Sequence, residues 1–134
     1  MRRRLAAAVP AVAALTLAVP ALAQDLNSFR AQHKRPPLTV SATLAGLAYQ
    51  QAAAMAGRGR IDHKDFRTRI GPIGSTHAEN VLVGCDDEAC AIARWAKSGG
   101  HRRNMLRGDV SAYGIASATG ANGRKYWALE LGGE

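Results

Sequence analysis

The feature that most restricts what this chain can fold into is its N-terminal segment, which has the pattern of an export signal. Three arginines at positions 2–4 precede an apolar run over residues 5–19, and residues 21–23 read Ala-Leu-Ala. A basic start, a short apolar stretch and a small-x-small site are typical of a cleaved secretory signal. We therefore expect a signal peptide over residues 1–23 and a mature protein that begins at Gln24.

The same segment has a competing interpretation as an uncleaved membrane anchor. Pro10 and Pro20 interrupt the apolar run, whereas a membrane-spanning helix needs about 20 consecutive apolar residues. The arginine run alone also leaves a twin-arginine export route open. We expect a secreted or periplasmic protein with no transmembrane segment once the signal has been removed.

Composition predicts a single small domain over residues 24–134. Of the 134 residues in the chain, 47% are hydrophobic and 21% are charged, which excludes a wholly disordered chain. Removal of residues 1–23 takes away three of the 18 basic side chains and none of the 10 acidic ones, so the net charge falls from +8 to +5. The remaining basic residues are scattered rather than gathered beside aromatic side chains, so we expect no nucleic-acid partner.

Only two cysteines occur in the chain, Cys85 and Cys90. Export places them in an oxidising environment, where a local disulfide is favoured. A structural zinc site needs four ligands, and the acidic residues at 86–88 disfavour a reactive thiolate. A reactive thiol is the alternative interpretation, and we expect the disulfide.

Hydrophobic periodicity and capping residues predict a mixture of helices and strands. After Ser41, apolar residues at positions 44, 47, 48, 52 and 55 follow helical spacing and predict the most regular helix. The expected elements, in chain order, are helices over residues 25–34 and 41–59, a helical turn at 65–70, a strand at 77–84, a helix at 87–98, and hairpin strands at 112–118 and 125–132. This order predicts one layered α/β domain with an antiparallel sheet between helices.

Four segments carry a resemblance to a known family. They are HAENVLVG at residues 77–84, WAKSGGHRRNML at 95–106, AYGIA at 112–116 and YWALELG at 126–132, and they follow a helix that begins PLTVSATL. In this order and spacing they resemble the CAP superfamily, which groups cysteine-rich secretory proteins, insect antigen 5 and plant pathogenesis-related proteins. The resemblance covers essentially the whole mature domain. It implies an α/β fold, a three-layer α-β-α sandwich with a central antiparallel sheet.

The resemblance also implies a central cleft with two histidines and two acidic side chains. By motif, His63, Glu79 and His101 match three of these positions, whereas Ser98 stands where many relatives have a glutamate. Two neutral imidazoles and one carboxylate can hold zinc or another divalent metal and leave positions for water. We expect His63, His101 and Glu79 to be metal ligands, at a site weakened by the missing acid.

Each of these side chains also has a purely structural explanation. His63 could be an exposed loop histidine, His101 could cap the short helix that follows, and Glu79 could pair with an arginine. The residues that the resemblance implies as supports of the cleft are Ser98, Asn80 and Asn104. The asparagines are expected to bond to backbone groups and hold the surrounding loops.

Three classes of function are compatible with this pattern. The first is a secreted binding module whose cleft takes a divalent ion and whose surface meets a lipid, glycan or protein; the resemblance favours this class. The second is a hydrolase, a peptidase or esterase, with Glu79 and His101 as candidate catalytic residues. The third is a structural protein of the cell envelope. Since no Gly-x-Ser-x-Gly motif occurs, we expect a monomeric binding protein rather than an enzyme.

Overall fold

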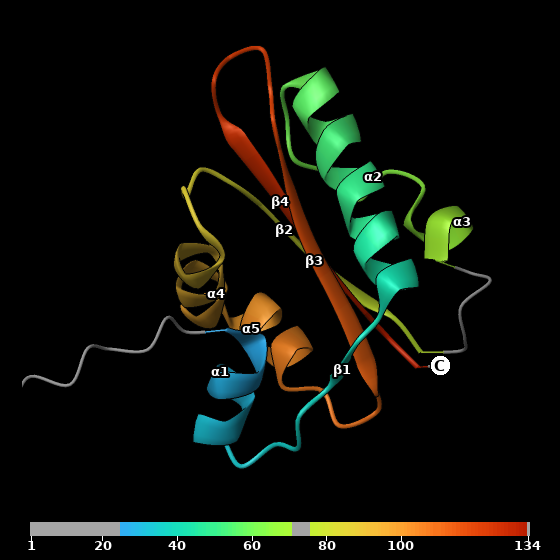
Figure 1. Ribbon diagram of the computed structural model, residues 1–134, viewed down its shortest axis with the longest axis vertical. Helices are drawn as coiled ribbons and strands as arrows, with labels where there is room; N and C mark the ends of the chain where they lie inside the picture. The colour runs from blue at the N-terminus through green and yellow to red at the C-terminus, as the bar shows by residue number, and fades with distance from the viewer. Residues whose placement is uncertain (1–24, 71–75, 134) are drawn as a thin grey trace, which may run out of the picture.

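The computed structural model describes residues 25–70 and 76–133 (Figure 1). Its elements are helices α1 (Leu26–Gln32), α2 (Ala42–Arg58), α3 (Phe66–Ile70), α4 (Glu88–Ala96) and α5 (Gly99–Met105), and strands β1 (Thr39–Val40), β2 (Ala78–Val83), β3 (Ala112–Thr119) and β4 (Lys125–Gly132). The predicted signal peptide over residues 1–23 lies outside the described residues. Within the described ranges, no helix combines the length and the apolar character needed to cross a membrane.

The four strands form one sheet in the order β1-β3-β4-β2. β4 pairs antiparallel with β3 on one side and with β2 on the other. β1 adds a two-residue parallel strand beside Ala112 and Tyr113. The sequence-based elements do not include β1, because two residues are too few to show the alternation that marks a strand.

Three of the helices begin with a capping side chain. Side chains of Asp25, Ser41 and Asp87 accept hydrogen bonds from backbone N–H groups in the first turns of α1, α2 and α4. Gly59 ends α2 in the left-handed conformation, with φ 69°, which glycine adopts without strain. Lys97 and Ser98 separate α4 from α5, and the glycine pair at 99–100 forms the first turn of α5.

Helices cover both faces of the sheet, with α2 on one face and α1, α4 and α5 on the other (Figure 1). Alternate residues of each strand point to opposite faces, so two separate cores form. The core under α2 consists of Ala48, Ala52, Met55, Val81, Tyr126 and Ala128. The larger core on the opposite face includes Leu26, Phe29, Ile92, Trp95, Trp127 and Leu129. This arrangement confirms the predicted α-β-α sandwich.

α2 rests directly on β3 at Gly114. A Cβ atom added at this position would overlap the backbone of Leu44 and Ala45. Only glycine lets the helix backbone approach the strand so closely. This contact fixes the start of α2 over the sheet, and α2 in turn leads into the loop that carries His63.

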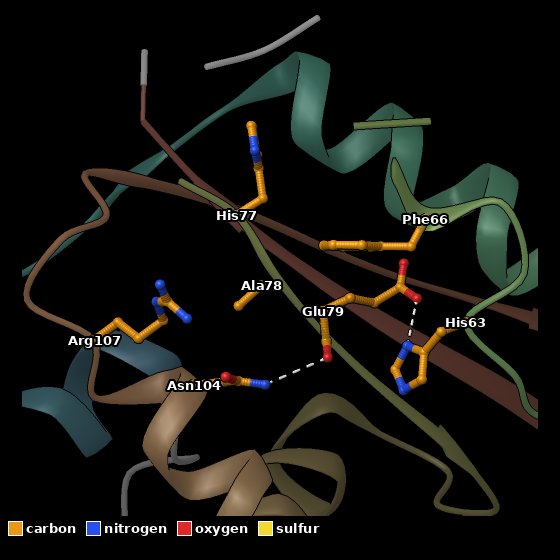
Figure 2. A pocket seen from close by; sticks show the side chains of 7 residues that line it. All are labelled: His63, Phe66, His77, Ala78, Glu79, Asn104 and Arg107. Atoms are coloured by element: carbon orange, nitrogen blue, oxygen red, sulfur yellow. Dashed lines mark hydrogen bonds and ion pairs between the residues drawn. The ribbon is translucent and has the colours of Figure 1, made fainter. Parts of the chain in front are cut away.

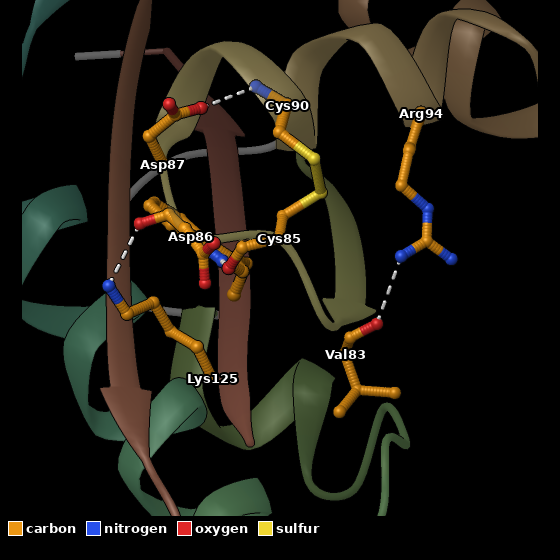
Figure 3. Close-up of a disulfide and its surroundings, with 8 residues drawn as sticks. Val83, Cys85, Asp86, Asp87, Cys90, Arg94 and Lys125 are labelled. Atoms are coloured by element: carbon orange, nitrogen blue, oxygen red, sulfur yellow. Dashed lines mark hydrogen bonds between the residues drawn. A yellow bond between two sulfur atoms is a disulfide. The ribbon is translucent and has the colours of Figure 1, made fainter. Parts of the chain in front are cut away.

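Cys85 and Cys90 form a disulfide, which confirms the predicted local pairing (Figure 3). The bond connects the chain just after β2 to the first turn of α4. Asp87 Oδ1 accepts a hydrogen bond from Cys90 N at 2.9 Å, and Lys125 Nζ donates to the carbonyl oxygen of Asp86 at 2.9 Å. Together these contacts fasten the start of α4 to one end of the sheet.

Candidate functional site

A cavity of about 250 Å³ lies along β2, at the edge of the sheet (Figure 2). Its lining residues are His63, Phe66, His77, Ala78, Glu79, Asn104 and Arg107. They come from the loop after α2, from α3, from β2 and from the end of α5. Figure 2 shows the His63 imidazole pointing toward the Glu79 carboxylate, so two of the predicted site residues meet at this cavity.

Glu79 is the centre of a buried hydrogen-bond network under α2. Its side chain is 1% exposed, and Oε1 lies 2.7 Å from Nδ1 of His63. Arg69 donates to both carboxylate oxygens, from Nη1 to Oε2 at 2.8 Å and from Nη2 to Oε1 at 3.2 Å. Gln51 Nε2 adds a longer contact to Oε1 at 3.4 Å. A carboxylate has about four acceptor sites, so this chain's own donors occupy nearly all of them.

A second carboxyl group, that of Glu130, lies beside Glu79 in the same network. The two residues are register partners on β2 and β4, and Glu130 is fully buried. Arg69 Nη1 reaches Glu130 Oε1 at 3.3 Å. Burial, together with the hydrogen bond and the negative charge of Glu79, raises the pKa of Glu130 to about 10. Glu130 is therefore neutral at physiological pH.

The protonation of Glu130 explains how two carboxyl groups can share this space. Its Oε2 atom is buried and has no hydrogen-bond partner among the described residues, which is less costly for a neutral carboxylic acid than for a carboxylate. Burial raises the pKa of Glu79, but hydrogen bonds from Glu130, Arg69 and His63 outweigh burial and lower it. The result is one carboxylate and one carboxylic acid around a single guanidinium, so the buried network has no net charge.

His63 is held in place by the loop that follows α2. Gln51 Nε2 donates to the backbone oxygen of Asp62 at 2.7 Å, and Arg58 Nη2 pairs with Asp62 Oδ1 at 2.6 Å. The His63 side chain is 53% exposed. With Nδ1 directed at the Glu79 carboxylate, the ring presents Nε2 as the nitrogen available to a ligand.

His101 lies on α5, and it does not line the cavity. It is close enough to His63 for their charges to interact. Burial lowers the pKa of His101, and the charge of His63 lowers it further, so the imidazole is favoured in its neutral form. Ser98 is the residue before α5 and makes no side-chain capping bond. Of the predicted residues, His63 and Glu79 are in direct contact, whereas His101 and Ser98 stand apart from them.

The two predicted support residues, Asn80 and Asn104, connect α5 to β2. Asn104 Nδ2 donates to Asn80 Oδ1 at 2.9 Å, and Asn80 Nδ2 donates to the backbone oxygen of His101 at 3.0 Å. Asn104 Nδ2 also lies 3.5 Å from the backbone oxygen of Glu79. These contacts set the position of His101 relative to Glu79.

The described residues contain no group of three or more His, Cys, Asp or Glu side chains placed to hold a metal ion. The oxygens of Glu79 are also taken by Arg69, His63 and Gln51. Two imidazoles, those of His63 and His101, are the groups that could bind a divalent metal here, with Glu79 fixing the orientation of the His63 ring. A three-ligand set of His63, His101 and Glu79 stays a prediction.

Sequence reasoning did not identify Arg69, Glu130 or Gln51 as part of this site. Arg69 lies in a polar segment with several other basic residues, so nothing in the pattern distinguishes it. Glu130 did offer a signal: it is the only charged residue in the apolar segment 126–132. A charge in a buried strand needs a partner, and that requirement alone points to a cluster.

The family model of CAP, the cysteine-rich secretory protein family, matches residues 24–131. No curated protein sequence matches the chain. An outer surface protein from Borrelia burgdorferi shares the fold with a TM-score of 0.72 at 16% identity, over 81% of this chain and 86% of that protein.

Two longer bacterial proteins contain a similar domain. One is an extracellular protein with an SCP domain from Bacillus anthracis, with a TM-score of 0.69 at 21% identity, over 81% of this chain and 38% of that protein. The other is a cysteine-rich secretory protein from Staphylococcus aureus, with a TM-score of 0.64 at 20% identity, over 79% of this chain and 35% of that protein. The chain thus spans well under half the length of these two proteins, and identities this low indicate a shared fold.

Proposed function

Because this chain belongs to the CAP family of cysteine-rich secretory proteins, we propose that it is a secreted or periplasmic binding protein whose ligand occupies the cavity beside β2. The ligand class is a polar group of a lipid, glycan or protein. His63 and Arg107 supply polar contacts in the cavity wall, and Phe66 and Ala78 supply apolar ones.

The observation that carries this proposal is the occupied carboxylate of Glu79. A general base needs a free lone pair within reach of the proton that it removes. The contacts of Glu79 with Arg69, His63 and Gln51 leave it little capacity for that task. Among the described residues that line the cavity there is no serine, threonine or cysteine, so none of them supplies a hydroxyl or thiol nucleophile. The site is better suited to recognition than to turnover.

The same proposal includes a weakly held divalent ion, with His63 Nε2 and His101 as its ligands. When bound, such an ion would supply a positive charge that attracts an anionic group of the ligand. Isothermal titration of the mature protein with ZnCl₂ tests this. We expect binding by the wild type and by His33→Ala, which removes a histidine at the C-cap of α1 that does not line the cavity, and loss of binding in His63→Ala/His101→Ala. Binding should weaken toward pH 5, because imidazoles must be neutral to ligate.

Identical titrations of the wild type and the double variant would contradict the ion site. They would leave open the binding of an organic ligand, which is tested separately. A screen of peptide and ester substrates should show no turnover above that of the His63→Ala variant. Turnover that this substitution abolishes, in a protein that remains folded, would overturn the binding proposal in favour of a hydrolase.

A further inference from the structure

The cavity beside β2 has a second polar end, at Arg107. The Arg107 side chain lines the cavity and is 32% exposed, and Figure 2 shows it extending toward Ala78, across the cavity from His63. Nε and Nη2 each donate to the carboxylate of Asp109 at 2.9 Å. Within the described residues, no group bonds to Nη1. Because a guanidinium has five N–H donors, one edge of it stays available at the cavity wall.

Arg107 is held in this position from two sides. Arg30, which is 1% exposed, donates from Nη1 to the carbonyl oxygens of Met105 and Arg107 at 2.8 and 2.9 Å. These bonds fix the backbone where α5 ends, and Asp109 fixes the guanidinium. A side chain that is already positioned loses little conformational freedom when it binds a ligand. Arg107 is therefore preorganised to contact an anion.

The segments that line the cavity carry an excess of positive charge. Residues 63–70 contain three basic side chains and one acidic one, and residues 101–109 contain the same numbers. β2 adds a single carboxylate, Glu79, which pairs with Arg69 at 2.8 Å. The net formal charge of the three segments is therefore +3. A cavity with this balance attracts anions and repels cations.

Asn104 supplies a hydrogen-bond acceptor next to this cation. It lines the cavity one turn before Arg107, whose backbone N–H donates to the Asn104 carbonyl oxygen at 3.3 Å. Its Nδ2 atom donates to Asn80 Oδ1 at 2.9 Å and lies 3.5 Å from Glu79 O. Its Oδ1 atom accepts no hydrogen bond from the described residues. A ligand at this end of the cavity therefore meets a charged donor and a neutral acceptor side by side.

These neighbours indicate one class of anion. A doubly charged phosphate is usually held by several cations, whereas Arg107 is the only arginine or lysine among the described residues that line the cavity. Asp109 already offsets part of its charge. A single planar carboxylate suits one edge of a guanidinium. The last residue of a peptide carries such a carboxylate and, on the same Cα atom, an N–H group that can donate to Asn104 Oδ1.

We propose that this end of the cavity binds the C-terminal carboxylate of a peptide. Arg107 contacts the carboxylate, Asn104 Oδ1 accepts from the N–H group of the last residue, and the apolar side chains of Phe66 and Ala78 pack against the side chain of that residue. The inference rests on the proposed function of the cavity and narrows its ligand to one class.

Titration of the mature protein with acetyl-glycyl-leucine, followed by nuclear magnetic resonance, tests the proposal. The free acid should shift the signals of the lining residues Phe66 and Ala78. The same peptide with a C-terminal amide should bind about tenfold or more weakly, because it lacks the charge that Arg107 contacts. Equal affinities of the acid and the amide would overturn the proposal.

Variants with matched charge changes assign the preference for the acid to one side chain. Arg107→Gln should reduce the affinity for the acid to that for the amide. Arg103→Gln removes an exposed positive charge from α5 that does not line the cavity, and it should retain the preference. Thermal unfolding confirms that each variant is folded. A preference that persists in folded Arg107→Gln, or is lost in Arg103→Gln, would contradict the site.

The binding function of the cavity can fail separately. N-acetylglucosamine and dihexanoylphosphatidylcholine serve as glycan and lipid probes in the same titration. If one of them shifts the signals of the lining residues and neither peptide does, the carboxylate site is wrong and the binding function stands. If none of the probes shifts these signals, both proposals are contradicted.

Discussion

The two edges of the sheet, β2 and β3, differ in how far the rest of the chain bonds to their outward backbone groups. On β2, the outward carbonyl oxygens belong to Glu79, Val81 and Val83, and each has a side-chain donor. These donors are Asn104 at 3.5 Å, Trp95 at 3.0 Å and Arg94 at 3.2 Å. On β3, the outward groups beyond β1 have no such donors in the described structure. One edge is closed by α4 and α5, and the other is open.

The difference follows from burial. β2 lies beneath α4 and α5, where water cannot reach most of its backbone, and a buried carbonyl without a donor is costly. The outer half of β3 is only partly buried, so water can satisfy its backbone until another strand replaces it. The closed edge therefore contributes to the stability of the fold, whereas the open edge depends on water for its hydrogen bonds in the described structure.

The largest expected effect tests whether β3 is held by its face rather than by its edge. In Gly114→Ala, the new methyl group would overlap the backbone of Leu44 and Ala45, and α2 would have to move off the strand. We expect the free energy of unfolding to fall by about 3 kcal/mol or more, as measured by urea denaturation.

Gly46→Ala is the matched control for this substitution. Gly46 lies inside α2, and a Cβ atom there meets nothing within 4 Å. Because alanine is the better helix former, this variant should be more stable by about 0.5–1 kcal/mol. Equal effects of the two substitutions would show that helix propensity, rather than contact with β3, determines the result.

The next prediction concerns Trp95, whose indole N–H donates to an outward carbonyl oxygen of β2. Trp95→Phe keeps most of a fully buried side chain but removes the Nε1 donor to Val81 O, which is also buried. We expect a loss of about 2 kcal/mol in unfolding free energy, because the carbonyl is left without a partner away from water. Trp127→Phe removes a similar bond to the half-exposed Cys85 carbonyl and should cost clearly less. A cost for Trp95→Phe no larger than that for Trp127→Phe would contradict our account of the closed edge.

The disulfide next to the closed edge should have an effect of similar size. Cys85 and Cys90 enclose a loop of about six residues, for which the chain-entropy model gives about 2 kcal/mol. Reduction should lower the melting temperature without abolishing folding, and it should speed hydrogen exchange in the first turn of α4. Two free thiols in the intact mass of protein isolated from the cell envelope would show that the bond does not form there.

The two edges also mark what sequence can and cannot reveal. Ser41 and the helical stripe that follows it are local patterns, and they predicted α2 correctly. His63 and Glu79 were found by motif, and they do meet. Sequence analysis did not identify Arg69 and Glu130, because their role depends on which strands become neighbours. The strand order β1-β3-β4-β2 cannot be deduced from the spacing of residues. The open edge of β3 could not be predicted for the same reason, since it depends on where β1 ends.

The last prediction tests whether Glu130, buried beside Glu79 on the closed side of the sheet, is neutral. Burial is the chief cause that raises its pKa in the folded protein from the ordinary 4.5 to about 10. Its contribution to stability is thus complete below about pH 4.5 and is lost as the pH rises toward 10, because the unfolded chain ionises first. Glu130→Gln keeps a neutral side chain that can donate to Glu79, and it cannot ionise.

This substitution should therefore flatten the decline of the unfolding free energy between pH 5 and pH 8, and at pH 8 it should make the protein more stable than the wild type. Asp86→Asn removes an exposed carboxylate outside the network and should leave that slope unchanged. Urea denaturation across this pH range measures both. If the curves of the wild type and Glu130→Gln run parallel, Glu130 is ionised in the folded protein. The pair of carboxyl groups around Arg69 would then carry a net negative charge, and the closed side of the sheet would attract a cation that the present network excludes.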